Sequence, residues 1–373
     1  MTFPLLAALA FTAPTVALAL VVGLVRWLLR RPQRRYWRAV LWLHLGLYPL
    51  HLFVTFPAAL GYVGSRVIGT RGDEQSYQGP RILPSGALQV QTTSTLRAER
   101  AGAEVDPATL AAVDGRRHTV TTPAGVELRA YCVEAVDDEP AFVAVLVHGL
   151  FRSSLELEPV AKMLRQRGGE CWLVDQRNHG RSGRAPFTGG LRESEDLVAV
   201  VDYVRRQPGR AARPLVLFGV SLGTIAVTLA LPRIDGVAAV VLDAPIEDLT
   251  AAAHRMMTFA RPGDRRSAFY MYEPWRSLIV ASIGAWSGFS MTDVRPIEVV
   301  ESMAHDLPAL VVAEELDDRA PPERVRELFD RMPQHVGTKE LLVVPGVGHG
   351  KAFRDAPALY ESALDALLGR LRR

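Results

Sequence analysis

The chain has 373 residues, of which 49% are hydrophobic and 22% are charged, so it can bury a sizeable core and does not have the composition of a disordered protein. Its formal net charge is +3, and its 43 basic residues are scattered among 40 acidic ones apart from one N-terminal cluster. This scatter argues against the continuous basic surface of a nucleic-acid-binding protein, and we expect no nucleic-acid partner. The two cysteines, Cys132 and Cys171, lack metal-ligand spacing and fit either two buried thiols or one bridge.

Two uncharged stretches, 2–25 and 39–65, lie close to the N-terminus, and each exceeds the roughly 20 apolar residues that cross a bilayer. Aromatic residues cluster at the ends of these stretches that face the segment between them, as interfacial aromatics do. We therefore predict that residues 1–65 form a hairpin of two transmembrane helices. A cleaved signal peptide is the alternative for the first stretch, but that stretch lacks a charged beginning and a second apolar run follows it.

The segment that connects the two predicted spans carries six arginines, namely Arg26, Arg30, Arg31, Arg34, Arg35 and Arg38. Positive charge is retained on the cytoplasmic side, so this loop is expected in the cytoplasm and residues 66 onward on the extracytoplasmic side. Arg66 and Arg71, just past the second span, weakly oppose that orientation. The localisation we expect is the plasma membrane of a bacterium.

Residues 66–115 contain many glycines, prolines and short polar runs, and we interpret them as a tether with one short helix near 107–113. From residue 116 to 373 the pattern changes. An antiparallel hairpin is expected over 118–135, and apolar strands then alternate with amphipathic helices. The expected strands are 142–149, 170–175, 214–220, 237–245, 307–315 and 339–346, and the expected helices are 153–169, 191–207, 222–231, 321–332 and 357–373. This alternation predicts an α/β domain with a mostly parallel sheet flanked by helices.

The sequence Gly219-Val220-Ser221-Leu222-Gly223 falls where a predicted strand turns into a predicted helix. In that setting the pattern G-x-S-x-G is typical of a nucleophile elbow, in which glycines remove the side chains that a sharp turn would crowd. Ser221 would then lie at the carboxyl edge of the sheet, at the start of a helix whose dipole favours a developing anion. The alternative is a tight turn that happens to contain a serine.

A serine needs a base to remove its proton and an acid to orient that base. His349 follows the last predicted strand, and Asp317 and Asp318 follow the strand before it. The order Ser221, Asp317, His349 is the order of an α/β-type catalytic triad, with Asp318 and the earlier Asp243 as alternative acids. The expected oxyanion hole consists of the backbone amides of Leu222 and Leu150.

From about residue 117 to 373 the chain resembles the α/β-hydrolase superfamily, in its lipase-like and serine-aminopeptidase-like branch. The resemblance rests on VLVHG, the D-x-R-x-H-G-x-S loop that starts at Asp175, GVSLG, and the LDD and GVGHG segments. It implies that residues 175–183 form a structural loop and that Asp317 is the triad acid. His148 lies one residue past a predicted buried strand, and we expect it to support its loop. Three departures are HGLF in place of an HGGG oxyanion motif, the doublet Asp317-Asp318 at the acid position, and Glu314 where a glycine is usual.

An insert of about 246–300 follows the strand 237–245, and this fold commonly places a lid there. Its methionines and aromatic residues suit an acyl substrate or the core of the lid itself. We predict a membrane-anchored serine hydrolase of the carboxylesterase or lipase type, with an acyl or lipid-like ester as substrate and with no metal or cofactor. The alternatives are an acyltransferase, thioesterase or aminopeptidase on the same triad, or a non-catalytic scaffold.

Overall fold

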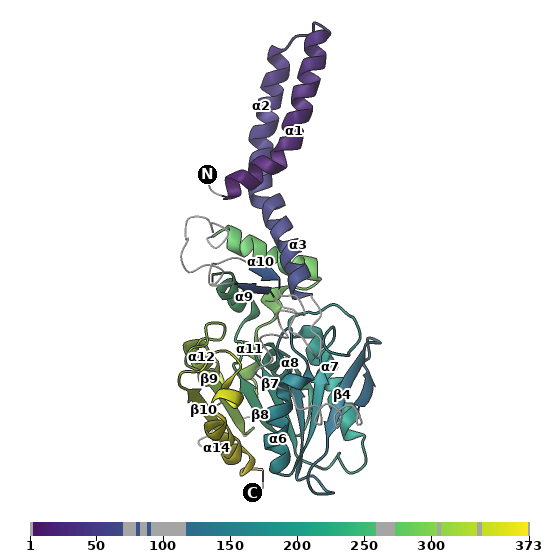
Figure 1. Cartoon of the computed structure of the whole chain (residues 1–373), viewed down its shortest axis with the longest axis vertical. Coiled ribbons are helices and arrows are strands. Elements are labelled where there is room, and N and C mark those ends of the chain that lie inside the picture. Colours follow the sequence, from purple (N-terminus) through teal and green to yellow (C-terminus); the bar gives the residue numbers. More distant parts are fainter. Residues whose placement is uncertain are drawn as a thin grey trace. The chain divides into compact units, whose positions relative to one another are not determined.

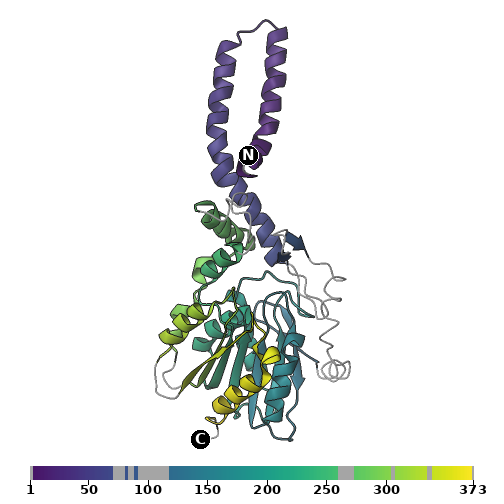
Figure 2. The same ribbon diagram turned by 60° about the vertical axis from the view of Figure 1, so that its left-hand side comes forward.

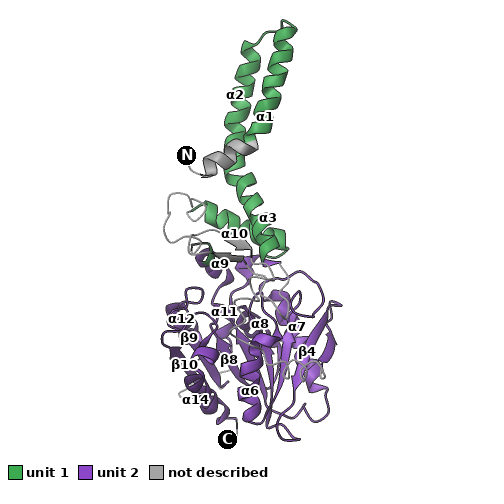
Figure 3. Cartoon of the chain, viewed as in Figure 1, with its two compact units in different colours: residues 1–67, 82–88, 256–289 green, residues 68–81, 89–255, 290–373 purple. Residues whose placement is uncertain are grey.

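The computed structural model describes residues 3–69, 80–82, 88–90, 117–258, 273–303, 307–333 and 338–371. The chain forms two compact units (Figure 3). One unit contains residues 1–67, 82–88 and 256–289, and the other contains residues 68–81, 89–255 and 290–373. Residues 116–373, the predicted catalytic domain, are divided between the two units, because residues 256–289 belong to the first.

The first unit begins with two helices that run side by side (Figure 1). Helix α1 spans Phe3–Leu28, and α2, Arg34–Leu50, continues without a break through the π-helical turn η1, His51–Thr55, into α3, Phe56–Ile68. The hydroxyl of Tyr36 donates a hydrogen bond to the carbonyl of Ala19 at 2.6 Å, which ties α2 to α1. A helical hairpin is thus present where two uncharged stretches were found in the sequence.

Among the described residues, one helix is long and apolar enough to cross a bilayer, and it is the continuous helix Arg34–Ile68 of 35 residues. Its apolar side chains are largely exposed within the chain, with Trp42 72% and Leu41 58% accessible. The described apolar part of α1, Thr12–Leu28, is shorter than a typical span. One membrane-spanning candidate is therefore supported by length and composition, and the second predicted span stays a prediction.

The second unit is built on an eight-stranded sheet in the order β10-β9-β8-β7-β5-β6-β4-β3. The six strands from β10 to β6 are mutually parallel, and β4 and β3 add an antiparallel edge. Every residue of β5, β6, β7 and β9 is buried, because helices cover both faces. The strands are β3 Arg117–Thr121, β4 Glu127–Val133, β5 Phe142–Val147, β6 Gly169–Asp175, β7 Leu215–Val220, β8 Val237–Asp243, β9 Ala309–Glu314 and β10 Lys339–Val344.

Helices α6, Glu158–Gln166, and α14, Pro357–Leu368, share one core with the sheet and cover one of its faces (Figure 2). Helices α7, Leu191–Arg205, and α8, Leu222–Ala230, lie side by side on the other face (Figure 1). The remaining helices of eight residues or more are α9, Leu249–Thr258, α10, Trp275–Ser287, and α12, Pro322–Arg331. Short helical segments are η2 Ser154–Leu157, η3 Leu231–Arg233, η5 Met291–Asp293, α11 Pro296–Val300 and α13 Ala352–Asp355.

The prediction of an α/β fold with a mostly parallel sheet is confirmed. The predicted tether contains two short strands that the sequence did not indicate, β1 Pro80–Ile82 and β2 Leu88–Val90. The helix predicted near 107–113 lies outside the described residues. Both cysteines are buried and free.

Candidate active site

Ser221 lies at the corner between β7 and α8, in a backbone conformation that few residues adopt. Its φ is 53° and its ψ is −124°, a left-handed conformation that costs about 1–3 kcal/mol for a residue with a side chain. The amide of Ser221 donates to the carbonyl of Asp243 at the end of β8, at 2.8 Å, so the neighbouring strand holds the strained residue in place. The serine is therefore presented at the carboxyl edge of the sheet, as an elbow requires.

The two glycines of the elbow are required by space. A Cβ at Gly219 would lie 2.8 Å from backbone atoms of Gly223, and a Cβ at Gly223 would lie 2.4 Å from the carbonyl oxygen of Val147. Both distances are shorter than real Cβ atoms show, and in each case the obstacle is backbone that cannot move aside. The turn thus needs glycine at both positions because β5, β7 and α8 converge there.

The structure brings Ser221, His349 and Asp317 into one hydrogen-bonded chain. The Oγ of Ser221 lies 2.6 Å from Nε2 of His349, and Nδ1 of His349 lies 2.7 Å from Oδ2 of Asp317. An ionised carboxylate has no hydrogen to donate, so Nδ1 carries the proton and the lone pair of Nε2 faces the serine hydroxyl. This tautomer is the one in which a histidine can take a proton from serine.

Asp317 is the acid that reaches the histidine, and its neighbour Asp318 is exposed. The second oxygen of Asp317 accepts hydrogen bonds from the amides of Arg319 and Ala320, at 2.8 and 3.0 Å. These two donors fix the carboxylate with Oδ2 directed at the imidazole. Asp243, the other alternative acid, is fully buried and instead accepts a hydrogen bond from the hydroxyl of Tyr360 at 2.8 Å.

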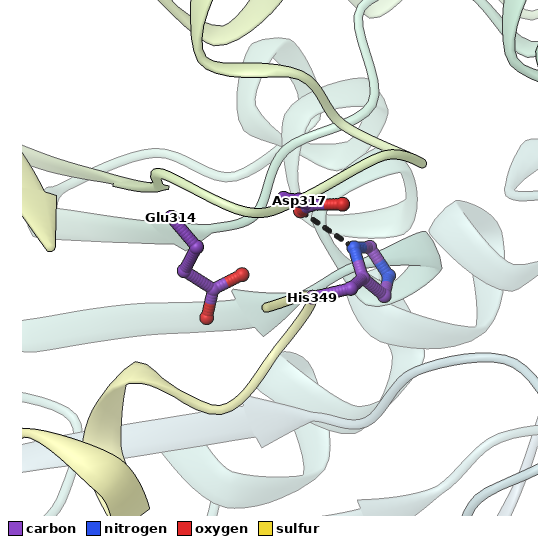
Figure 4. Close-up of side chains that lie close together, drawn as sticks. All are labelled: Glu314, Asp317 and His349. Atoms are coloured by element: carbon purple, nitrogen blue, oxygen red, sulfur yellow. Dashed lines mark hydrogen bonds and ion pairs between the residues drawn. The ribbon is translucent and has the colours of Figure 1, made fainter. Parts of the chain in front are cut away.

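Glu314 is a site residue that sequence reasoning noted only as a departure from a glycine pattern. It ends β9, three residues before Asp317, and is fully buried. Its carboxylate accepts three backbone hydrogen bonds from the residues directly after His349, namely from Gly350 at 2.6 Å, Lys351 at 2.7 Å and Ala352 at 2.9 Å. Figure 4 shows the Glu314 carboxylate close to the loop that carries His349. Glu314 therefore fixes the backbone from which the His349 imidazole projects.

Two buried carboxyl groups, Glu314 and Asp243, lie at the ends of neighbouring strands. Burial raises the pKa of Glu314, while its backbone N–H donors act in the opposite direction. Burial raises the pKa of Asp243 well above its usual range, and the negative charge of Glu314 raises it further. Because Glu314 has three donors and Asp243 has only the Tyr360 hydroxyl, we assign the charge to Glu314 and the retained proton to Asp243.

Glu314, Asp317 and His349 also have the residue types of a metal site, since one ligand atom from each lies within 4.8 Å of the others. Their hydrogen bonds favour the triad instead. Nδ1 of His349 carries the proton shared with Asp317, and Nε2 faces Ser221. The two oxygens of Glu314 are directed at backbone N–H groups, so the donor atoms that a cation would need are already engaged.

The loop after β5 supplies one of the two expected oxyanion amides, and buried histidines support it. A Cβ at Gly149 would lie 3.3 Å from the Cβ of Ser221, so this loop passes beside the nucleophile. His148 contacts the carbonyl of Gly149 at 2.7 Å through Nδ1 and accepts the amide of Gln176 at 3.1 Å through Nε2. Burial lowers the pKa of His148 to about 4, so the ring is neutral and acts as a support.

The Leu150 amide directly precedes Phe151, whose φ of 61° and buried ring fix the turn. The amide of Phe151 donates to Nε2 of His179 at 3.2 Å. Leu222 is the first residue of α8, so its amide has no acceptor within the helix and is free to face a substrate oxygen. Leu222 thus directly follows Ser221, and Leu150 directly follows Gly149, which lies beside the serine. Their role as oxyanion donors stays a prediction.

Residues 175–183 form a tightly bonded loop at the end of β6. Asp175 accepts the amides of Ser154 and Arg181, at 2.7 and 2.9 Å, and Arg177 forms a buried bidentate ion pair with Asp196 at 2.6 Å. These bonds link the loop to η2 and α7. Its side chains are engaged in holding backbone, which fits the structural role that the resemblance implies.

The model of the alpha/beta hydrolase family matches residues 144–363, which include the elbow, the acid and the histidine. The chain belongs to the alpha/beta hydrolase family. The sequence is 22% identical over 252 residues to the uncharacterized protein YqkD of Bacillus subtilis (strain 168), covering 66% of this chain and 77% of that protein.

Three solved structures share the fold at low identity. An esterase of Pyrococcus furiosus, Pf2001, is 21% identical with a TM-score of 0.55, covering 68% of this chain and 90% of that chain. The alpha/beta hydrolase GrgF from Penicillium sp. sh18 is 22% identical with a TM-score of 0.53, covering 69% and 99%. Est1E from Butyrivibrio proteoclasticus, solved with ferulic acid bound, is 17% identical with a TM-score of 0.52, covering 69% and 100%.

Proposed function

We propose that this alpha/beta hydrolase is a serine hydrolase that cleaves carboxylic esters through an acyl-enzyme. The observation that carries the proposal is the continuous chain from Ser221 through His349 to Asp317, at 2.6 and 2.7 Å, with the serine on a strained elbow. A serine on such an elbow costs folding energy that a purely structural turn would avoid by using glycine.

In the first half-reaction the Oγ of Ser221 forms a bond to the ester carbonyl carbon while Nε2 of His349 takes the hydroxyl proton. Asp317 stabilises the imidazolium that results. The amides of Leu222 and Leu150 donate to the oxyanion of the tetrahedral intermediate. The intermediate collapses as the bond to the alcohol oxygen breaks, and His349 returns its proton to that oxygen.

In the second half-reaction a water molecule gives its proton to His349 and attacks the acyl carbon. The acyl–Oγ bond then breaks, the carboxylic acid leaves and Ser221 regains its proton. In each half-reaction His349 returns the proton that it takes. The residues of this chain therefore supply the base, the acid and the nucleophile for both half-reactions.

A fluorophosphonate probe tests this proposal on the full chain in detergent. We expect covalent labelling of the wild type, no labelling of Ser221→Ala, and unchanged labelling of Ser302→Ala, which removes an exposed serine of the same unit. Ester hydrolysis by Ser221→Ala should fall by roughly 10⁴-fold or more. Equal labelling of wild type and Ser221→Ala would refute the assignment.

We further propose that the N-terminal helices anchor the enzyme in a membrane, with an acyl or lipid-like ester as substrate. The apolar 35-residue helix and the arginines between α1 and α2 support an anchor. The same arginines favour a cytoplasmic connecting loop and an extracytoplasmic hydrolase unit in a bacterial plasma membrane. Protease protection in sealed, oriented membrane vesicles tests this: digestion of the hydrolase unit from the cytoplasmic face would reverse the orientation.

A further inference from the structure

The insert between β8 and β9 is built onto the N-terminal helices. Residues 256–289 belong to the same compact unit as residues 1–67 (Figure 3). The described contacts are made by α10, which lies along the C-terminal part of the continuous helix Arg34–Ile68. A lid that serves only its own domain would not need such contacts.

The first contact repairs a defect in the long helix. In the π-helical turn η1, the amide of Phe56 donates to the carbonyl of His51, so the next donor in that pattern would be residue 57. Pro57 has no N–H, which leaves the carbonyl of Leu52 without that partner. The indole Nε1 of Trp275 donates to this carbonyl at 3.1 Å, and the Trp275 ring stacks on Phe53 with centroids 5.5 Å apart. In an apolar environment an unpaired carbonyl costs several kcal/mol, so α10 compensates the proline.

The second contact depends on small residues. A Cβ at Gly61 would lie 2.3 Å from the Cβ of Ser282, and a Cβ at Gly64 would lie 2.8 Å from the side chain of Ile283. Close backbone approach through glycine and serine is typical of helix pairs in membranes, where small residues replace the hydrophobic effect as the source of tight packing. Gly46, in the same long helix, has open space around it. In the long helix, glycine is thus needed at positions 61 and 64, where α10 packs, whereas a larger side chain would fit at position 46.

The length of the long helix indicates the depth at which α10 lies. Its 35 residues extend about 52 Å, whereas the hydrocarbon core is about 30 Å thick and needs about 20 residues. If the core begins after Arg38, the last arginine of the connecting cluster, it ends near Ala58. The indole of Trp286 donates to the carbonyl of Ala58 at 3.0 Å, and its ring meets Tyr62 edge-on at 5.3 Å.

These aromatic residues match the depth of the headgroup region. Trp286 is 57% exposed and Tyr62 is 48% exposed within the chain, although both are large and mostly apolar. Tryptophan and tyrosine concentrate at the membrane–water boundary because their rings are amphipathic. The surface they form continues directly from the proposed span, so the occupant that fits it is the lipid interface of the same bilayer.

The insert starts at the edge of the sheet that carries the triad. Within the insert, Arg255 pairs with Glu247 at 2.8 Å. Arg255 also donates to the carbonyl of Arg319 at 3.2 Å, two residues past Asp317. The amide of Ile246 donates to Oγ1 of Thr224, three residues past Ser221. Residues bonded to the catalytic edge and helix α10 therefore belong to the same insert.

We propose that α10 is an interfacial helix that receives amphiphilic esters from the bilayer for the triad. It is held on the proposed membrane span by Trp275 and Trp286, and by close packing against Gly61 and Gly64 of α3. This inference rests on the proposed esterase activity. It adds a lipid-contacting surface and a substrate class, an ester with one polar end and a long acyl chain.

The first test measures where α10 lies. Ala285 of α10 and Ala358 of α14 are both exposed helical alanines, so Ala285→Cys and Ala358→Cys are matched labelling sites. Cys132 and Cys171 are buried, which directs a thiol-reactive environment-sensitive fluorophore to the introduced cysteine. In full chain reconstituted into phosphatidylcholine vesicles, we expect spin-labelled lipids to quench the label at 285 and not at 358. Equal quenching at both positions, or none at 285, would overturn the proposal.

The second test measures what the docking does. Gly61→Leu would displace α10, whereas Gly46→Leu adds the same side chain to the same helix in open space. The readout is the ratio of the rate on a long-chain ester in vesicles to the rate on a short soluble ester. We expect this ratio to fall roughly tenfold in Gly61→Leu and to stay unchanged in Gly46→Leu, because docking supplies a local concentration of substrate. An unchanged ratio in both would overturn the proposal.

Trp275→Phe provides a milder version, since it removes only the indole donor to Leu52 and keeps a ring against Phe53. We expect the same ratio to fall, by less than in Gly61→Leu. Fluorophosphonate labelling of Ser221 distinguishes failure of the proposed esterase activity from failure of the interfacial-helix proposal. An unlabelled wild type refutes the esterase, whereas a labelled, active wild type with an unquenched position 285 refutes only the interfacial helix.

Discussion

Replacement of Glu314 should slow catalysis although this side chain does not touch the substrate. In Glu314→Ala, three amides lose their common acceptor, those of the buried residues Gly350 and Ala352 and that of the exposed Lys351. A buried donor left without a partner costs about 1–3 kcal/mol, and entry of water into the vacated space offsets part of the sum. We therefore expect a loss of about 3 kcal/mol in the free energy of unfolding.

A second effect of similar size should fall on kcat. The three amides directly follow His349, so release of this backbone shifts the imidazole away from Ser221, and a misplacement of about 1 Å costs roughly 100-fold in rate. Glu314→Gln should be milder, because its remaining oxygen can still accept from Lys351 and Ala352 while its amide nitrogen faces the N–H of Gly350. Loss of one hydrogen bond of this kind corresponds to a roughly tenfold lower kcat.

The assay is the hydrolysis of a p-nitrophenyl ester by the full chain in detergent, with active molecules counted by fluorophosphonate titration. The matched control is Glu315→Gln, because Glu315 is exposed and its carboxylate accepts one backbone N–H, that of Gly346, at 2.7 Å. We expect the control to retain wild-type kcat and KM. If Glu314→Ala lowered only the unfolding midpoint and kept wild-type kcat per active molecule, Glu314 would not position His349.

Three further outcomes follow from buried groups of the same unit. Gly223→Ala should destabilise the fold by about 1–3 kcal/mol and abolish fluorophosphonate labelling, because its Cβ would lie 2.4 Å from the Val147 carbonyl oxygen. Gly46→Ala is the control, since Gly46 has open space around it. Equal unfolding midpoints for the two variants would contradict the steric argument. The pKa of His148 is lowered to about 4 in the folded chain, so as the pH falls the unfolded chain protonates this histidine before the folded chain does. The free energy of unfolding should therefore fall by about 3 kcal/mol between pH 6.5 and 4. Denaturant titrations of His148→Gln should lack this pH dependence. Burial raises the pKa of Asp243, so the folded chain keeps a proton that the unfolded chain loses above about pH 4. The wild type should therefore lose stability relative to Asp243→Asn as the pH rises. Parallel profiles of unfolding free energy against pH for the two proteins would show that Asp243 is ionised.

The sequence could predict the parts of the site that depend on local chain geometry. A glycine-flanked serine between an apolar strand and an apolar helix indicates an elbow, since only glycine avoids the crowding at such a corner. The positions of Asp317 and His349 followed from strand order, because the carboxyl ends of parallel strands meet at one edge of the sheet. The choice of Asp317 over Asp318 rested on resemblance, and the structure separates them by burial and by contact with His349.

The remaining features depend on contacts between segments far apart in the chain. The role of Glu314 requires the amides that follow β10 to reach the end of β9, which no local pattern encodes. An acidic residue in place of the usual glycine was the available signal, since a buried carboxylate needs donors. For Trp275 and Trp286, the insert composition fitted both an acyl pocket and a core of its own. Neither interpretation included packing against the N-terminal helix. Two separated glycines such as Gly61 and Gly64 are a weak sign of helix packing when the partner helix is not known.

The triad members are held by different neighbours, and this separation explains why the loss of Glu314 should disturb His349 and leave the elbow intact. The Ser221 amide is bound by the Asp243 carbonyl on β8, so the elbow keeps its conformation when the β9–β10 side of the site changes. His349 depends on Glu314 for its backbone and on Asp317 for its ring, both at the end of β9. A loosened His349 loop therefore leaves a correctly folded nucleophile without a base at 2.6 Å, and the damage appears in proton transfer, the step that this geometry serves.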